Sequence, residues 1–118
     1  MISIGSPVTG GTGKTPFLLF LLEKLDHKNV AILSRGYLSK GEKKNVSIQN
    51  TPYFDPKWAG DEPYLIQKTF PEALVIVGKK RVKSAKIAEQ QGKSLLILDD
   101  GLQHFGLKRD LEIITLLD

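Results

Sequence analysis

The sequence predicts an α/β fold in which helices cover both faces of a mostly parallel sheet. Short apolar runs alternate along the chain with helix-like stretches, which is the pattern of parallel β/α units. The short runs are apolar at successive positions, as expected for strands that helices cover on both sides. At 118 residues the chain is long enough for a single core, so we treat residues 1–118 as one domain.

The first predicted unit is a strand, a glycine-rich loop and a helix. Residues 1–5 form the strand and residues 7–13 form the loop. The helix covers residues 15–25, where Pro16 is tolerated because the first turn has no intrahelical donor to lose. This helix is apolar nearly all round. We expect later elements to bury it, and the alternative is a surface that contacts a membrane.

The middle of the chain is less regular. Residues 30–33 are a predicted strand, and the polar residues 34–44 are a predicted loop. Residues 46–48 fit a short strand. Residues 51–60 contain two prolines and are expected to be irregular.

The second half of the chain returns to the alternating pattern. It predicts helices over residues 61–68 and 79–91 and strands over residues 74–77, 94–98 and 111–117. A loop is predicted over residues 99–108. The chain ends on that last strand, so we expect an incomplete domain from a longer protein or a shortened gene product.

Composition narrows the class of partner. Lys and Arg number 17 against 13 Asp and Glu, a net charge of +4 that suits nucleotides, phosphates or acidic lipid surfaces. The excess is too small to predict nucleic-acid binding. Without cysteine the chain has no disulfide scaffold and no thiolate metal site, which fits a reducing compartment. The longest apolar run, residues 17–22, is too short to span a bilayer, and no secretory signal is visible.

The stretch PVTGGTGKTP lies at the junction of the first strand and helix. It lacks the first glycine of G-x-x-x-x-G-K-[ST], because Val8 stands there. Phosphate binding needs a strand, a turn with inward N–H groups and a helix N-terminus, all of which the pattern predicts. The alternative is a glycine-rich turn with an exposed lysine. The predicted nucleotide-binding residues are Thr9, Gly10, Gly11, Thr12, Gly13, Lys14 and Thr15.

Lys14 would reach the β- and γ-phosphates, and the Thr15 hydroxyl would bind Mg²⁺. The run SLLILDD predicts a second part of this site, because an apolar strand ends there in Asp99 and Asp100. Such carboxylates at a strand end can hold Mg²⁺ directly or through water. On an extended backbone the two would point to opposite sides. The alternative is a pair of loop-capping aspartates.

Three further groups are candidates. Asp61 in the GDEP stretch either caps a helix or accepts the proton of an attacking hydroxyl. His104 is either structural or part of the site beside the two aspartates. Arg81, close to the end of a predicted strand, is the candidate phosphate ligand in a basic helix whose lysines otherwise form a solvated face.

The motifs GGTGKTP, SRGY, GDEP and DDGLQH followed by RDLEI stand in this order along the chain. Together they closely resemble the tetraacyldisaccharide 4'-kinase family, the lipid A 4'-kinases of Gram-negative bacteria, over essentially the whole chain. That family's phosphate loop also lacks the first glycine. The resemblance implies a P-loop NTPase-like fold and transfer of the ATP γ-phosphate to the 4'-hydroxyl of tetraacyldisaccharide 1-phosphate. It also implies a cytoplasmic enzyme that is peripheral at the inner membrane.

The resemblance implies residue roles as well. Lys14 would act on the phosphates, Asp61 would help to deprotonate the sugar hydroxyl, and the aspartate pair would organise Mg²⁺-ATP. The residues implied at or near the substrate are Tyr37, Glu62, Arg81, Gln103 and His104.

Two departures from the family matter. Its members carry a helical, membrane-contacting segment before the first strand, and they continue past residue 118 into a second, smaller domain. The histidine that partners the catalytic aspartate lies in that later part and is not His104. An alternative is therefore a non-catalytic nucleotide-binding module or truncated gene product. A P-loop GTPase is disfavoured, because the chain has no N-K-x-D segment.

Overall fold

A six-stranded sheet forms the centre of the protein in a computed structural model, which describes residues 2–5, 14–35, 40–99 and 111–114. The strand order is β3-β4-β2-β5-β1-β6. All pairings are parallel except that of β3 with β4. The strands are β1 Ile2–Gly5, β2 Val30–Ser34, β3 Val46–Ser47, β4 Leu74–Val77, β5 Leu95–Asp99 and β6 Leu111–Ile114.

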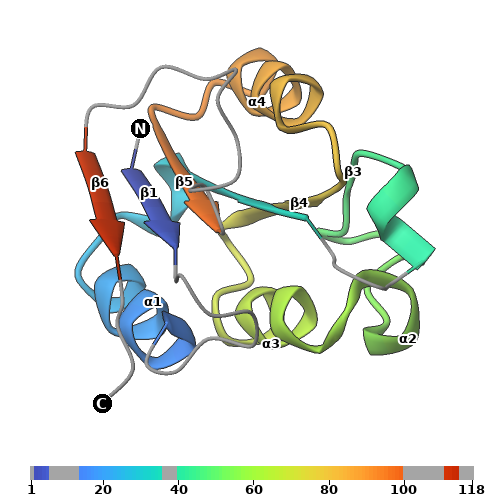
Figure 1. Ribbon diagram of the computed structural model, residues 1–118, viewed down its shortest axis with the longest axis horizontal. Helices are drawn as coiled ribbons and strands as arrows, with labels where there is room; N and C mark the ends of the chain where they lie inside the picture. The colour runs from blue at the N-terminus through green and yellow to red at the C-terminus, as the bar shows by residue number, and fades with distance from the viewer. Residues whose placement is uncertain (1, 6–13, 36–39, 100–110, 115–118) are drawn as a thin grey trace.

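Helices cover both faces of this sheet, as predicted. Helices α1 and α3 lie on one face, and α4 lies on the other (Figure 1). The α-helices are α1 Lys14–Glu23, α2 Pro56–Ala59, α3 Asp61–Thr69 and α4 Arg81–Gln90, and the 3₁₀ helices are η1 His27–Asn29 and η2 Lys40–Lys43. Among the described residues, none of the helices is both long enough and apolar enough to cross a bilayer.

The core consists of two apolar layers separated by the sheet. Successive side chains of a strand point to opposite faces. In β2, Val30 and Ile32 therefore pack in the layer beneath α1 and α3, whereas Ala31 and Leu33 pack in the layer beneath α4. All four are buried, which explains why the first four positions of the strand are apolar.

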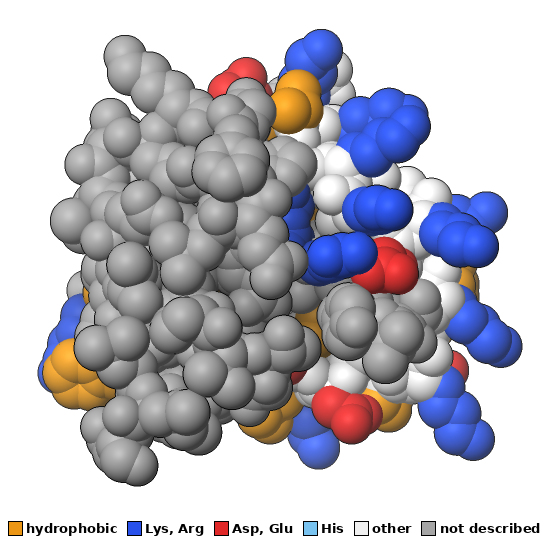
Figure 2. All heavy atoms as spheres, viewed as in Figure 1, with side chains coloured by type: hydrophobic (Ala, Val, Ile, Leu, Met, Phe, Trp, Pro, Cys, Tyr) orange, Lys and Arg blue, Asp and Glu red, His pale blue; other side chains and the backbone are white. Residues whose placement is uncertain are grey.

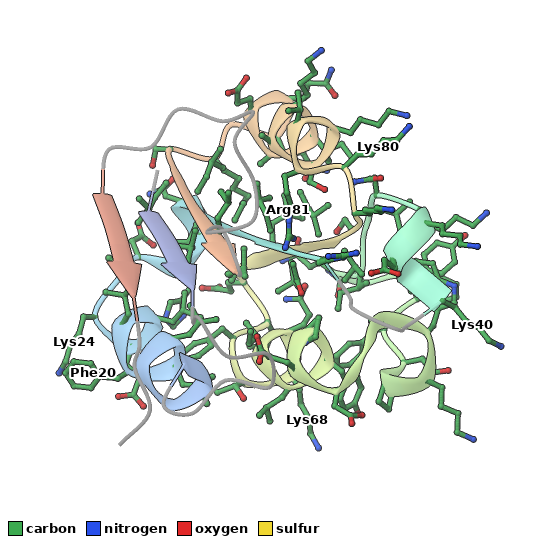
Figure 3. The ribbon with its side chains drawn as sticks, in the orientation of Figure 1. Phe20, Lys24, Lys40, Lys68, Lys80 and Arg81 are labelled. Atoms are coloured by element: carbon green, nitrogen blue, oxygen red, sulfur yellow. The ribbon has the colours of Figure 1, made fainter. Side chains whose placement is uncertain are left out.

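The predicted burial of α1 holds for only part of its surface. Leu18 and Leu22 are fully buried, but Phe20 is 58% exposed. Lys24 Nζ lies 5.5 Å from the centroid of the Phe20 ring, and Figure 3 shows both side chains on the outer side of the helix. The expectation of burial all round was therefore wrong at Phe20, because α1 covers only one face of the sheet.

The irregular connection predicted over residues 51–60 contains helix α2. Asp55 accepts a hydrogen bond from the backbone N–H of Lys57 at 3.0 Å, and Pro56 occupies the start of the helix. Proline fits this position because its missing N–H would have no intrahelical partner. The helix ends at Gly60, whose φ of 99° favours glycine. The prediction of an irregular segment was therefore wrong at residues 56–59, because Pro56 starts a helix there instead of breaking one.

The buried amide of Gln67 ties α3 to the sheet. Its Nε2 donates to the carbonyl oxygens of Ala73 at 2.7 Å and Phe70 at 3.2 Å. Its Oε1 accepts from the backbone N–H of Val75 at 3.2 Å. One side chain therefore satisfies two backbone carbonyl groups of the turn after α3 and one backbone N–H of β4, and so fixes the position of α3.

We expect Gln67→Leu to lower the free energy of unfolding by about 2–4 kcal/mol, since it leaves buried backbone groups without these bonds. Urea denaturation followed by circular dichroism measures the change. Gln49→Leu is the matched control, because Gln49 Nε2 donates one exposed bond to Pro71 O at 2.8 Å. The control should lose less than about 1 kcal/mol. Equal losses in the two variants would contradict this role of Gln67.

Candidate functional site

The site predicted from the sequence falls at one edge of the sheet. Strands β1, β2, β4 and β5 run parallel, so their carboxyl ends lie together. The chain passes from β1 to β2 in one direction along the sheet, and from β5 to β6 in the other. In open α/β sheets, ligands bind at the carboxyl edge where the direction changes in this way.

The phosphate-loop sequence joins β1 to α1 at this edge. Strand β1 ends at Gly5 and α1 begins at Lys14, followed by Thr15. The predicted strand and helix on either side of the loop are therefore confirmed, while residues 9–13 themselves lie outside the described residues. A helix N-terminus favours anions, because its first N–H groups lack intrahelical partners and carry the positive end of the helix dipole.

The acidic strand end lies next to this junction. Asp99 is the last residue of β5, and in the parallel pairing it stands opposite Ile4 of β1. Asp100 lies outside the described residues. Hydroxyl and carboxylate oxygens are the ligands that Mg²⁺ takes, so Thr15 with Asp99 and Asp100 is a donor set that fits the ion. Among the described residues there is no group of three or more His, Asp or Glu side chains that could hold a metal.

Helix α3 brings Asp61 and Glu62 to the same edge. The helix leads into β4 and packs on the sheet, so its N-terminus lies near the carboxyl ends of the strands. The cap residue is Gly60, and no side chain among the described residues forms a cap hydrogen bond there. The helix-capping alternative for Asp61 is therefore wrong. Asp61 is exposed and Glu62 is half-buried. Both carboxylates lie in the first turn, where the helix dipole stabilises negative charge.

Arg81 begins α4 and is 2% exposed. Figure 3 shows it pointing from the start of α4 toward the middle of the molecule, whereas Lys80 points outward. The neighbouring basic residues Lys79, Lys80, Lys83 and Lys86 are all exposed, so the predicted solvated face is confirmed. Arg81 thus differs from its neighbours in being buried, and its role as a phosphate ligand stays a prediction.

The structure adds a second arginine, which the sequence reasoning passed over. Arg35 directly follows β2, and its Nε donates to Glu42 Oε2 at 2.8 Å in a half-buried ion pair. Its signal was present in the SRGY motif, since a basic residue at the end of a buried strand lies at the ligand-binding edge. Tyr37, Gln103 and His104 lie outside the described residues.

Comparison with known proteins agrees with this arrangement. The family model for tetraacyldisaccharide-1-P 4'-kinase matches residues 1–118. A tetraacyldisaccharide 4'-kinase from Aquifex aeolicus is 41% identical over 119 residues, which cover 98% of this chain and 38% of the relative. The corresponding protein from Halothermothrix orenii is 38% identical over 121 residues, which cover 98% of this chain and 32% of the relative.

A solved structure is also similar. The crystal structure of LpxK from Aquifex aeolicus in complex with ATP superimposes with a TM-score of 0.83 at 41% identity, covering 96% of this chain and 36% of that one. The chain therefore spans about a third of the length of these relatives. The match over its whole length, together with the ordered elements of the carboxyl edge, shows that the chain belongs to the tetraacyldisaccharide-1-phosphate 4'-kinase family.

Proposed function

We propose that this chain is the nucleotide-binding part of a kinase that transfers the ATP γ-phosphate to the 4'-hydroxyl of tetraacyldisaccharide 1-phosphate in lipid A biosynthesis. The observation that carries the proposal is the pairing of β1 with β5. It brings the strand before GGTGKT beside the strand that ends in Asp99. The relatives support the acceptor by their name, and the similar solved structure contains ATP.

In this proposal the phosphates bind at the start of α1. Backbone N–H groups of residues 9–13 would bind them, and Lys14 would neutralise charge on the β- and γ-phosphates. Thr15, Asp99 and Asp100 would hold Mg²⁺, which supplies positive charge to the phosphate oxygens when it is bound. Arg35 directly follows β2, and Arg81 begins α4, so both lie at this edge of the sheet. Both suit anionic oxygens, because a guanidinium group binds such oxygens in a bidentate manner.

Asp61 is the proposed general base. Its carboxylate accepts the proton of the 4'-hydroxyl as that oxygen attacks the γ-phosphorus. The bond from phosphorus to the oxygen that bridges the β- and γ-phosphates then breaks, and ADP leaves. The exposure of Asp61 at the first position of α3 supports this role, because an attacking hydroxyl must reach the carboxylate. Glu62, Tyr37, Gln103 and His104 are proposed as supporting residues.

We expect the 118-residue chain to bind Mg²⁺-ATP. The change Lys14→Ala should weaken this binding about tenfold or more, since it removes a charge-assisted contact.

In a polypeptide with this sequence at the full family length, Asp61→Asn should lower kcat about a hundredfold or more, with the KM for ATP little changed. Calorimetry and a phosphate-transfer assay measure the two effects.

Lys28→Ala is the control for binding, because Lys28 is an exposed lysine far from the α1 N-terminus in sequence. Unchanged turnover in Asp61→Asn would remove Asp61 from the mechanism. Nucleotide binding with no transfer at full length would favour the alternative of a non-catalytic nucleotide-binding module.

We also propose that the enzyme acts at the cytoplasmic face of the inner membrane, with one basic surface directed at the lipid. Residues 40–44 and 79–86 hold eight basic residues against one acidic residue, a formal charge of +7. The rest of the chain holds nine against twelve, a charge of −3. The seven exposed lysines of this basic surface are Lys40, Lys43, Lys44, Lys79, Lys80, Lys83 and Lys86.

The two segments of the basic surface are neighbours in space. The backbone N–H of Lys79 donates to Glu42 O at 2.6 Å, and Asn45 Nδ2 donates to Lys80 O at 2.7 Å. Figure 2 shows Lys and Arg side chains gathered on the side of the molecule where Figure 1 places β3 and α4. Each lysine near an anionic bilayer contributes about 1 kcal/mol to binding, so a surface of this charge supports peripheral attachment.

We expect neutralising Lys40, Lys43 and Lys83 to Gln together to weaken binding to vesicles that contain phosphatidylglycerol about a hundredfold, as three lost contacts of about 1 kcal/mol each imply. Vesicle sedimentation at low ionic strength measures this loss. The matched control changes Lys28, Lys57 and Lys68, which are exposed lysines outside the basic surface, to Gln. An equal loss in the control would mean that net charge alone governs binding and would contradict a directed surface.

A further inference from the structure

Residues 40–45 form a short bridge across the carboxyl ends of β2 and β4, and we call this segment the clasp. We infer that Glu42 and Asn45 of the clasp are positioning residues that hold Arg35 and Arg81 at the ligand-binding edge of the sheet. The inference rests on the proposed nucleotide site, and it assigns a task to residues outside the phosphate loop and the acidic strand end.

Glu42 connects the clasp to both strands. Its carboxylate holds Arg35 Nε at 2.8 Å, directly after β2. Its backbone oxygen accepts from the N–H of Lys79 at 2.6 Å, just after β4. Strands β2 and β4 are themselves joined here, because Gly78 N–H donates to Ser34 O at 2.9 Å. Through these bonds Glu42 fixes the direction of the Arg35 guanidinium relative to the turn that leads into α4.

Asn45 holds the first turn of α4. Its Nδ2 donates to Lys80 O at 2.7 Å and to Ser84 Oγ at 3.1 Å. Lys80 is the N-cap residue of α4, and Ser84 is fully buried. Arg81 lies between these two anchored residues and is itself buried. A shift of this turn would therefore move the Arg81 side chain, so the two bonds of Asn45 set where the guanidinium lies.

The backbone around the clasp is built for close contact. Asn45 has a φ of 68°, a left-handed conformation that asparagine tolerates better than most residues. A Cβ atom on Gly78 would lie 2.5 Å from the Asn45 Cα atom, so only glycine fits opposite it. A Cβ atom on Gly41 would lie 2.8 Å from the Trp58 ring and 2.9 Å from a Val77 methyl group. The clasp is therefore seated tightly on β4 and α2.

Arginines that are held in place before a ligand arrives bind phosphate more tightly than mobile ones. A guanidinium binds phosphate oxygens through a planar fork of N–H groups, so its affinity depends on direction as well as on charge. Long side chains otherwise lose conformational entropy when they bind a ligand. Holding Arg35 by its Nε and Arg81 through its helix turn lowers this cost before the ligand arrives.

The test uses the 118-residue chain with inorganic tripolyphosphate and Mg²⁺-ATP as probes, at a temperature where circular dichroism shows every variant to be folded. Asn45→Gly keeps a residue suited to positive φ and removes both donor bonds. Glu42→Gln removes the charge that holds Arg35. We expect each change to weaken tripolyphosphate binding about tenfold, the scale of one lost bond to a charged group.

Asn50→Gly is the matched control, since Asn50 also has a positive φ, of 55°, and lies outside the clasp. It should leave the affinity within about twofold. A second measurement separates positioning from general stability. Arg81→Lys should weaken binding in the wild type but add little in Asn45→Gly, because neighbouring residues that act through one group are not additive.

Two results would overturn the inference: equal affinities in Asn45→Gly and Asn50→Gly, or additive losses for Asn45→Gly with Arg81→Lys. The outcomes also separate this inference from the proposed function. A wild-type chain that binds tripolyphosphate but not ATP, with the expected losses in the clasp variants, contradicts the kinase proposal and supports the clasp. A wild-type chain that binds neither probe overturns both.

Discussion

The parallel pairing of β1 with β5 is the interaction on which the rest of the site depends. The two strands are separated by some ninety residues of sequence, yet Ile4 and Asp99 stand opposite each other. This pairing places the start of α1, with its N–H groups and lysine, beside a strand that ends in a carboxylate. Because β5 also pairs with β2, the ends of three strands meet at one edge.

The helices and connections then determine what surrounds that edge. The three bonds of Gln67 tie helix α3 to β4 and to the turn before it, and the first turn of the helix carries Asp61. On the far side of the sheet, the clasp ties the ends of β2 and β4 to α4 through Glu42 and Asn45. Acidic groups therefore approach the edge from the α3 face, and arginines approach it from the strand ends and α4. This separation of charge suits a bound anion that must also meet a general base.

The fold also determines where the positive charge of the chain gathers. A net charge of +4 is modest, and it hides a basic surface of seven exposed lysines, which lie in residues 40–44 and 79–86. Bonds from Lys79 to Glu42 and from Asn45 to Lys80 bring the segments together. The composition predicted an anionic partner, but only the bonds between residues 42–45 and the turn that leads into α4 brought the lysines of the two segments into one surface.

The alternation of strands and helices, the positions of β1 and α1 on either side of the glycine-rich stretch and the acidic end of β5 could all be predicted from the sequence. These features are local, because they follow from runs of apolar residues, glycines and the residues at strand ends. The start of α2 at Pro56, the exposure of Phe20 and the contacts of Arg35 and Asn45 could not be predicted from the sequence. Tertiary structure decided these, because burial and hydrogen-bond partners depend on which elements become neighbours. Asn45 reaches α4 only because β3 folds back along β4.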